Sequence, residues 1–174
     1  MTVRGRMGLA LAVALLGALP VQAQPKPTLV GAFKDWFAYT SGAGVNKVCY
    51  ALSQPKMTDP VGANRDPTFF LVSTWPTRKT GGEPSIVPGY PYKDGSKAQV
   101  QIGSDKFDFF TKNDGNTGGA WTQNPADERR LLAAMKHGAS MSITGISSRG
   151  TLTRDTYSLA GISAALDKAA ATCK

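Results

Sequence analysis

The sequence predicts a single, mainly β domain with one short helix near residues 125–137 and another at the C-terminus. Short runs rich in aromatic and β-branched residues recur along the 174 residues, and 19 glycines and 11 prolines supply turns between them. Hydrophobic residues make up 41% of the chain, which is enough for a core and excludes a disordered chain. Two later segments instead have helix-start signals and apolar residues at helical spacing.

Residues 1–23 have the pattern of a cleaved secretory signal peptide. Arg4 and Arg6 precede an uncharged run over residues 7–19, and small residues up to Ala23 suit a signal peptidase. The run is shorter than the about 20 apolar residues that span a bilayer. We therefore expect no transmembrane helix after cleavage, a flexible leader over residues 24–29 and one domain over residues 30–174.

The chain is basic, but its positive charge is dispersed. Loss of the two arginines in the signal lowers the formal net charge from +8 to +6. Nucleic-acid binding requires a patch that neutralises several phosphates together, and no such run is present, so nucleic acid is excluded as a partner. A solvated basic surface is favoured, with attraction to lipid head groups or glycans as the alternative.

The only cysteines are Cys49 and Cys173. In an exported protein disulfides persist, and two cysteines allow only one intramolecular pairing. The Cys-x-x-Cys spacing of redox catalysts is missing. We expect a structural disulfide.

The first two strands are expected over residues 33–40 and 45–52, joined by a turn over residues 41–44. The second run is apolar on both faces, which favours a strand inside a sandwich. Residues 54–67 carry three prolines and are expected to form a loop, and residues 68–75 a central strand. Further short strands are expected at residues 85–87, 98–102 and 106–111, and a final hairpin is expected to pair a strand around Met141 and Ile143 with residues 151–157.

The helix near residues 125–137 begins with Asn124 as its N-cap and Pro125 in its first turn, and it ends at Gly138. A closing helix is expected after a Ser158 cap. Its apolar positions step by three and four as far as Cys173, which places that cysteine on the buried face.

No catalytic residue, metal site or cofactor is predicted. The only imidazole, His137, lies at the C-terminal end of a predicted helix, where a positive charge interacts favourably with the helix dipole. A capping role is therefore favoured over a role in a Ser/His/Asp triad. Residues 108–119 lack the acid spacing of a calcium loop and are typical of a turn. A carboxylate pair brought together from distant strands is the remaining route to an enzyme, a glycan hydrolase.

Loops on a rigid β framework commonly carry binding residues. We expect the loops over residues 54–66 and 77–92 to meet a partner, which is an envelope protein, a glycan or a lipid head group. The candidate contact residues are Arg78, Lys79, Tyr90 and Tyr92.

Several segments, in order, carry a family resemblance. They are DWFAY (35–39), KVCYAL (47–52), FFLVST (69–74), GYPY (89–92), NDG (113–115), AW (120–121), RGT (149–151) and DTYSLAG (155–161). Together with a cysteine near each end, they make the chain similar to the invasion-associated locus B family of exported alphaproteobacterial proteins.

The resemblance implies an immunoglobulin-like β-sandwich with a C-terminal helix, located in the periplasm or at the outer envelope, or secreted. It also implies that Cys49 and Cys173 correspond to the family's paired cysteines, and it supplies no catalytic residues. We expect a non-enzymatic envelope protein that binds or supports a partner. The alternatives are the secreted hydrolase and, because founding members of the family are linked to entry into red blood cells, a host-cell adhesion factor.

Overall fold

A computed structural model describes residues 26–78 and 81–174, which form one antiparallel sheet of eleven strands and two α-helices. The strands are β1 (Thr28–Phe33), β2 (Trp36–Ser41), β3 (Val48–Ser53), β4 (Met57–Asp59), β5 (Phe69–Thr74), β6 (Glu83–Val87), β7 (Lys97–Ile102), β8 (Asp105–Asp114), β9 (Thr117–Trp121), β10 (Ser140–Ile146) and β11 (Leu152–Ser158). The helices are α1 (Pro125–His137), α2 (Ile162–Thr172) and the short 3-10 helix η1 (Gly44–Asn46). Neighbouring strands in the sheet follow the order β1-β2-β3-β5-β6-β9-β8-β7-β10-β11-β4.

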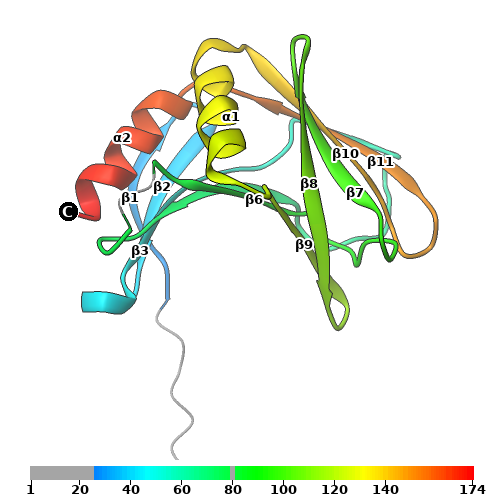
Figure 1. Cartoon of the computed structure of the whole chain (residues 1–174), viewed down its shortest axis with the longest axis horizontal. Coiled ribbons are helices and arrows are strands. Elements are labelled where there is room, and N and C mark those ends of the chain that lie inside the picture. Colours follow the sequence, from blue (N-terminus) through cyan, green and yellow to red (C-terminus); the bar gives the residue numbers. More distant parts are fainter. Residues whose placement is uncertain (1–25, 79–80) are drawn as a thin grey trace, which may run out of the picture.

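The sheet curls into an arch, with α1 and α2 together on one side of it (Figure 1). Side chains alternate between the two faces, as expected for β-strands. On β3, Cys49, Ala51 and Ser53 are buried, whereas the alternate residues are only half-buried. We call the face of Cys49 the inner face and the opposite one the outer face.

The core lies on the inner face, inside the curl and beneath the helices. Phe70 is its centre, with edge-on ring contacts to Trp36, Phe109 and Tyr157 from three other strands. The indole N–H of Trp36 donates to the Ser158 carbonyl at 2.9 Å, so the largest core side chain has its polar atom satisfied. The core therefore links strands from both ends of the chain.

Both predicted helices are confirmed. In α1 the Asn124 side chain accepts a hydrogen bond from the Asp127 N–H at 2.9 Å, which is the expected N-cap. The start of α2 differs from the expectation, because the N-cap is Gly161 and not Ser158. Gly161 has φ +97°, and a Cβ there would lie 1.9 Å from the Phe33 carbonyl oxygen, so only glycine fits.

The N-terminal strands also differ from the expectation. Residues 33–40 are not one strand, because the chain reverses at Lys34 and Asp35 between β1 and β2. Lys34 has φ +54°, and the Asp35 N–H donates to the Ala160 carbonyl at 3.2 Å. Strand β1 also takes in Thr28 and Leu29, which the sequence placed in a flexible leader.

The mainly β class is confirmed, but the immunoglobulin-like sandwich is not. All eleven strands belong to one hydrogen-bonded sheet, where a sandwich would have two packed sheets. The expected loop over residues 54–67 contains β4, which adds to β11 at one edge of the sheet. The signal peptide over residues 1–23 lies outside the described residues, and no helix within the described part of the chain is long and apolar enough to cross a membrane.

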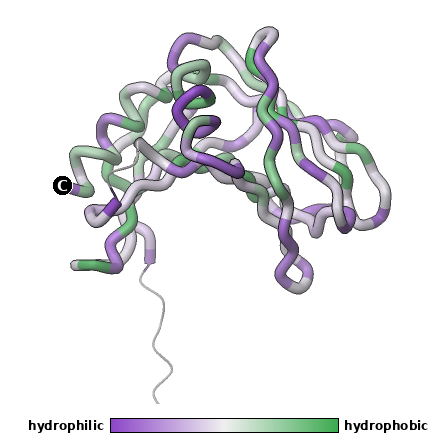
Figure 2. The backbone as a smooth tube through the Cα atoms, in the orientation of Figure 1, coloured by the Kyte–Doolittle hydropathy of each residue, from purple (hydrophilic) through white to green (hydrophobic). Residues whose placement is uncertain are grey.

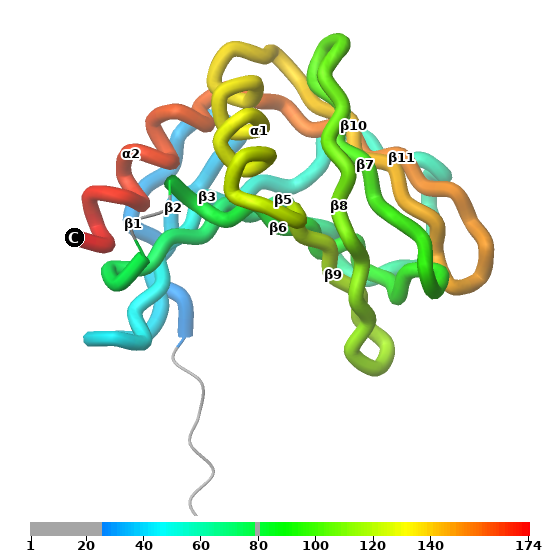
Figure 3. Tube along the Cα trace, viewed as in Figure 1, coloured from blue at the N-terminus to red at the C-terminus, as the bar shows by residue number. Residues whose placement is uncertain are grey.

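The predicted disulfide is confirmed. Cys49 on β3 and Cys173 at the end of α2 are bonded, 124 residues apart in sequence and with Cα atoms 5.8 Å apart. Figure 3 shows why this is feasible, because the C-terminal helix lies beside the first strands of the chain. The Lys47 ammonium also donates to the Thr172 carbonyl, so β3 and the end of α2 are held together twice.

Candidate functional site

Two of the four predicted contact residues, Arg78 and Lys79, are basic and precede β6 in the sequence. Arg78 is exposed and donates to the Glu83 carboxylate at 2.6 Å. Its guanidinium also lies 4.3 Å from the centre of the Trp75 ring. Lys79 lies outside the described residues. Arg78 is thus available at the surface, in a fixed orientation.

The other two, Tyr90 and Tyr92, are buried, with only 6% and 1% of their surface exposed. The backbone of Tyr92 exchanges two hydrogen bonds of 2.8 Å with the Asn113 side chain, and the residue forms a β-bridge with Ser147. These contacts hold the proline-rich segment over residues 88–92 against the inner face. This placement corrects the expectation that the two rings face a partner.

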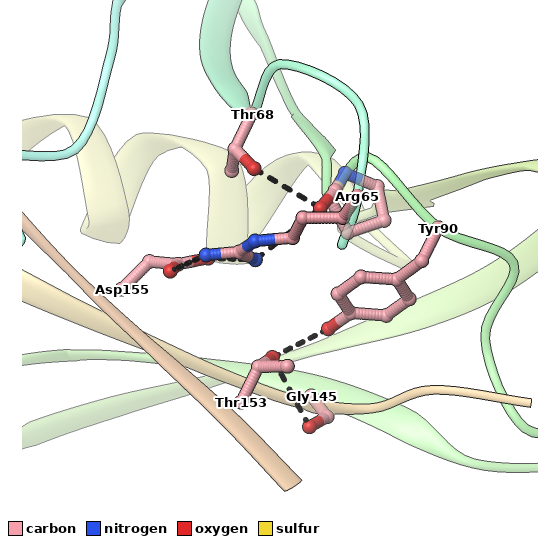
Figure 4. Close-up of polar contacts among 7 residues, drawn as sticks. Arg65, Thr68, Tyr90, Gly145, Thr153 and Asp155 are labelled. Atoms are coloured by element: carbon pink, nitrogen blue, oxygen red, sulfur yellow. Dashed lines mark hydrogen bonds and ion pairs between the residues drawn. The ribbon is translucent and has the colours of Figure 1, made fainter. Parts of the chain in front are cut away.

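Tyr90 instead belongs to a buried polar network around Arg65 and Asp155 (Figure 4). The guanidinium forms two hydrogen bonds with the Asp155 carboxylate, one of 3.0 Å, and a third of 3.3 Å with the Pro88 carbonyl. The Tyr90 hydroxyl lies 2.5 Å from that of Thr153, which donates to the Gly145 carbonyl.

Burial dominates the electrostatics of this network. It raises the pKa of Tyr90 and Tyr92, and it raises the pKa of Tyr157 well above its ordinary value. The hydrogen bonds that Arg65 donates to the Asp155 carboxylate raise the pKa of the guanidinium. Because the ion pair lies in the interior and holds the loop before β5 against β11, its role is structural.

The outer face has a different character, and we take it as the candidate functional site. Strand register aligns one row of outward-pointing residues across six strands. Together these residues, which we call the outer row, are Phe37, Leu52, Leu71, Ser85, Trp121 and Phe110. Phe37 and Phe110 are 36% and 40% exposed, and the other apolar members are half-buried.

A second set of apolar side chains widens this surface. Leu29, Tyr39 and Tyr50 face one another across β1, β2 and β3, and the two tyrosine rings are stacked at 5.5 Å. Phe69 and Val87 pair at the far ends of β5 and β6. We call the outer row and these five residues the outer aromatic face. Because both helices pack on the inner face, neither of them covers it.

The Trp121 end of the outer row has a hollow on each side. One hollow, of about 430 Å³, is lined by Glu83, Phe110, Lys112, Trp121, Thr122 and Glu128. The other, of about 500 Å³, is lined by Val87, Lys112, Asn113, Asp114, Thr117, Gly118, Gly119 and Trp121. Trp121 and Lys112 are common to both, so the ring stands between two concave sites of ligand size.

The outer surface of β7 and β10 is polar. A hollow of about 430 Å³ there is lined mainly by hydroxyl, amide and basic side chains, including Gln99, Thr144 and Arg154. Beside it, hydrogen bonds from Gln99 and Lys97 lower the pKa of Asp108. The outer row therefore ends at Phe110, beside a polar part of the sheet, and Figure 2 shows a hydrophilic tip on the β8–β9 hairpin.

Phe110 and Trp121 were not predicted as contacts. A signal for them was present, because Phe107 and Phe109 occupy the inner face of β8 and so place Phe110 outward. Their juxtaposition depends on the register of β8 with β9, which local sequence does not reveal.

The fold and this surface define a class: a small β protein, closed by one disulfide, with helices on one face of its sheet and an apolar surface on the other. The family model of the invasion associated locus B (IalB) protein matches residues 36–170. The chain therefore belongs to the IalB family, and the resemblance seen in its sequence is confirmed.

A crystal structure of invasion associated protein b from Bartonella henselae is similar to this structure, with a TM-score of 0.59. The two sequences are 14% identical, and the match covers 83% of this chain and 98% of the Bartonella chain. At this identity the comparison shows a shared fold. A search of curated proteins found no match.

Proposed function

We propose that this protein is exported to the periplasm or outer envelope, where it binds an envelope partner without catalysing a reaction. The observation that carries the proposal is the outer aromatic face. Membership of a family of exported proteins supports the location, as does a disulfide, because such bonds persist in oxidising compartments.

The outer aromatic face supports binding because it leaves apolar surface in water. Phe37, Phe110 and Leu29 are 36%, 40% and 52% exposed, in a surface that runs continuously across neighbouring strands. A contiguous apolar surface of this kind marks an interaction site, and aromatic residues contribute most to such contacts. Arg78 remains a proposed contact beside Glu83, and Lys79, which lies outside the described residues, stays a prediction.

Site-specific crosslinking in living cells tests this role. A photo-reactive amino acid at Leu71, in the outer row, is expected to give a discrete crosslinked product identifiable by mass spectrometry. The matched control is Thr144, which is also half-buried and points outward but lies on the polar part of the sheet. Equal products from both positions, or none from Leu71, would contradict the proposal.

One observation favours the hydrolase alternative. Glu83 and Glu128 come from different elements and line the same hollow beside Trp121, and two carboxylates flanking a glycan are the usual machinery of glycoside hydrolysis. Glu83, however, accepts from Arg78, and Glu128 lies 3.4 Å from the Thr122 hydroxyl. Release of reducing ends from cell-wall glycan, abolished by Glu128→Gln, would establish hydrolysis; we expect none.

The host-cell adhesion alternative draws on the family's description as invasion associated. It would use the same outer aromatic face. Binding of the purified protein to erythrocyte membranes, lost on Phe37→Lys, would support it.

A further inference from the structure

We propose that the Trp121 end of the outer row binds an uncharged oligosaccharide, with one sugar ring stacked on the indole. This inference rests on the proposed binding role and specifies the chemistry of the partner. We call Trp121 and Phe110 together the Trp121 platform.

The first argument is the orientation of the indole. A Cβ built on Gly119 would lie 2.3 Å from Cη2 of Trp121 and 2.9 Å from Cζ2. The six-membered ring therefore covers the strand backbone where a side chain would otherwise stand. The indole is thus held over the outer side of β9 at Gly119 and stays partly exposed.

Phe110 extends this surface. It is the register partner of Trp121, and the two ring centres are 5.7 Å apart with an interplanar angle of 31°. The rings are thus tilted neighbours rather than an edge-on pair, and together they give this part of the outer face an aromatic surface. Its width suits the C–H face of a pyranose, which is flat and apolar while its hydroxyls project from the rim.

The rim of the platform supplies hydrogen-bonding groups for the hydroxyls of a sugar. Carboxylates that accept hydrogen bonds are present in both hollows, from Glu83 and Glu128 on one side and Asp114 on the other. The Lys112 ammonium, a donor, borders both hollows. Sugar hydroxyls donate and accept, so they match a mixed rim that a purely apolar ligand would leave unsatisfied.

The charge of the lining residues discriminates between a neutral glycan and an anionic lipid head group. The two hollows are lined by three carboxylates and one lysine, and the Arg78 guanidinium pairs with one of these carboxylates, Glu83, which leaves one negative charge uncompensated. A phosphate, sulfate or uronate on this site would meet net negative charge, which opposes binding. The site therefore favours a neutral glycan over an anionic lipid head group.

The two hollows set a minimum length for the ligand. They have volumes of about 430 and 500 Å³ and meet at the Trp121 ring. A chain that crosses the indole places one sugar on the ring and a neighbour in each hollow. We therefore expect tri- and tetrasaccharides to bind more tightly than the monosaccharide.

The test is a titration of the isotope-labelled protein, followed by NMR, with the tetramers of N-acetylglucosamine, of β-1,4-glucose and of α-1,4-glucose up to millimolar concentration. At least one is expected to shift the Trp121 indole resonance and the backbone resonances of β8 and β9. Trp121→Ala is expected to weaken binding by roughly tenfold or more, whereas Trp121→Phe retains most of it.

The matched control is Tyr39→Ala. Tyr39 is also a half-buried aromatic residue of the outer face but lines neither hollow, so its loss should leave the affinity unchanged. Thermal unfolding of each variant verifies that it is folded. The titration of the unsubstituted protein tests glycan binding even if a variant fails to fold.

Three results would overturn the inference: no shift with any of the three tetramers, shifts confined to the polar hollow around Arg154, or unchanged affinity in folded Trp121→Ala. If these occur while the Leu71 crosslink persists, the glycan assignment fails and the binding role survives. If the Leu71 crosslink is also absent, both fail.

Discussion

Arg65 and Asp155, 90 residues apart in sequence, form a two-hydrogen-bond ion pair whose side chains are only 7% and 5% exposed. The pair joins the segment before β5 to a strand near the end of the chain. Because both charged groups are buried away from water, each is stabilised by its partner instead of by hydration.

Asp155→Asn is expected to lower the free energy of unfolding by about 3–5 kcal/mol, since it leaves the Arg65 guanidinium buried without its counter-charge. Urea denaturation measures the change. Asp108→Asn is the control, because Asp108 pairs with Lys97 at the surface and should cost less than about 1 kcal/mol. Equal losses from the two variants would show that burial of the Arg65 pair has no energetic weight.

Replacing both partners, as Arg65→Met with Asp155→Leu, is expected to destabilise the fold less than Asp155→Asn alone. An apolar pair leaves no unpaired charge, and such replacements of buried ion pairs are often close to neutral. If the double variant is the less stable of the two, the hydrogen bonds to Pro88 and its neighbours matter more than the charge pairing.

Removal of the disulfide with Cys49→Ser and Cys173→Ser is expected to lower the free energy of unfolding by about 2–5 kcal/mol. The bond closes a loop of more than 100 residues and so restricts the unfolded chain. Denaturation of the unsubstituted protein in the absence and in the presence of reductant gives the same comparison without any mutation. Coincident unfolding curves would refute the prediction.

Alkaline pH is expected to unfold the protein in a cooperative step. Burial raises the pKa of Tyr90, Tyr92 and Tyr157 in the folded state, so stability is fully present below the unfolded tyrosine pKa of about 10 and falls as the pH rises above it. Ultraviolet titration should show these phenols ionising together with the loss of circular dichroism. Reversible ionisation of all five tyrosines in the folded protein would contradict this.

Gly161→Ala is expected to be more destabilising than Gly150→Ala by about 1–3 kcal/mol. Both glycines have positive φ, at +97° and +84°, but only at Gly161 would a Cβ meet the Phe33 carbonyl. The two variants therefore separate the cost of the steric clash with Phe33 from the cost of placing alanine at a positive φ. Thermal unfolding of both proteins measures the difference.

Local signals predicted the features that depend on neighbouring residues. Asn124 and Pro125 marked the start of α1 because an N-cap and a first-turn proline act within one turn of helix. The turn at Lys34 and Asp35 was missed because neither residue is a glycine or asparagine, and the hydrogen bond to Ala160 that accompanies it comes from the far end of the chain.

The candidate site was only partly predictable for the same reason. Tyr90 and Tyr92 lie among prolines, which suggested a surface loop, but hydrogen bonds with Thr153 and Asn113 hold them inside. Trp121 and Phe110 meet through strand register, and the order of strands in the curled sheet arises from contacts distant in sequence.

The long separation of the two cysteines gives the protein a built-in order of maturation. If the chain crosses a membrane N-terminus first, Cys49 emerges as a free thiol and stays one until 124 more residues have followed. Oxidation is then the last event, available only when α2 has reached the first strands. The bond thus distinguishes a chain translocated as far as Cys173 from every shorter intermediate, and a product truncated before Cys173 would keep Cys49 as a free thiol.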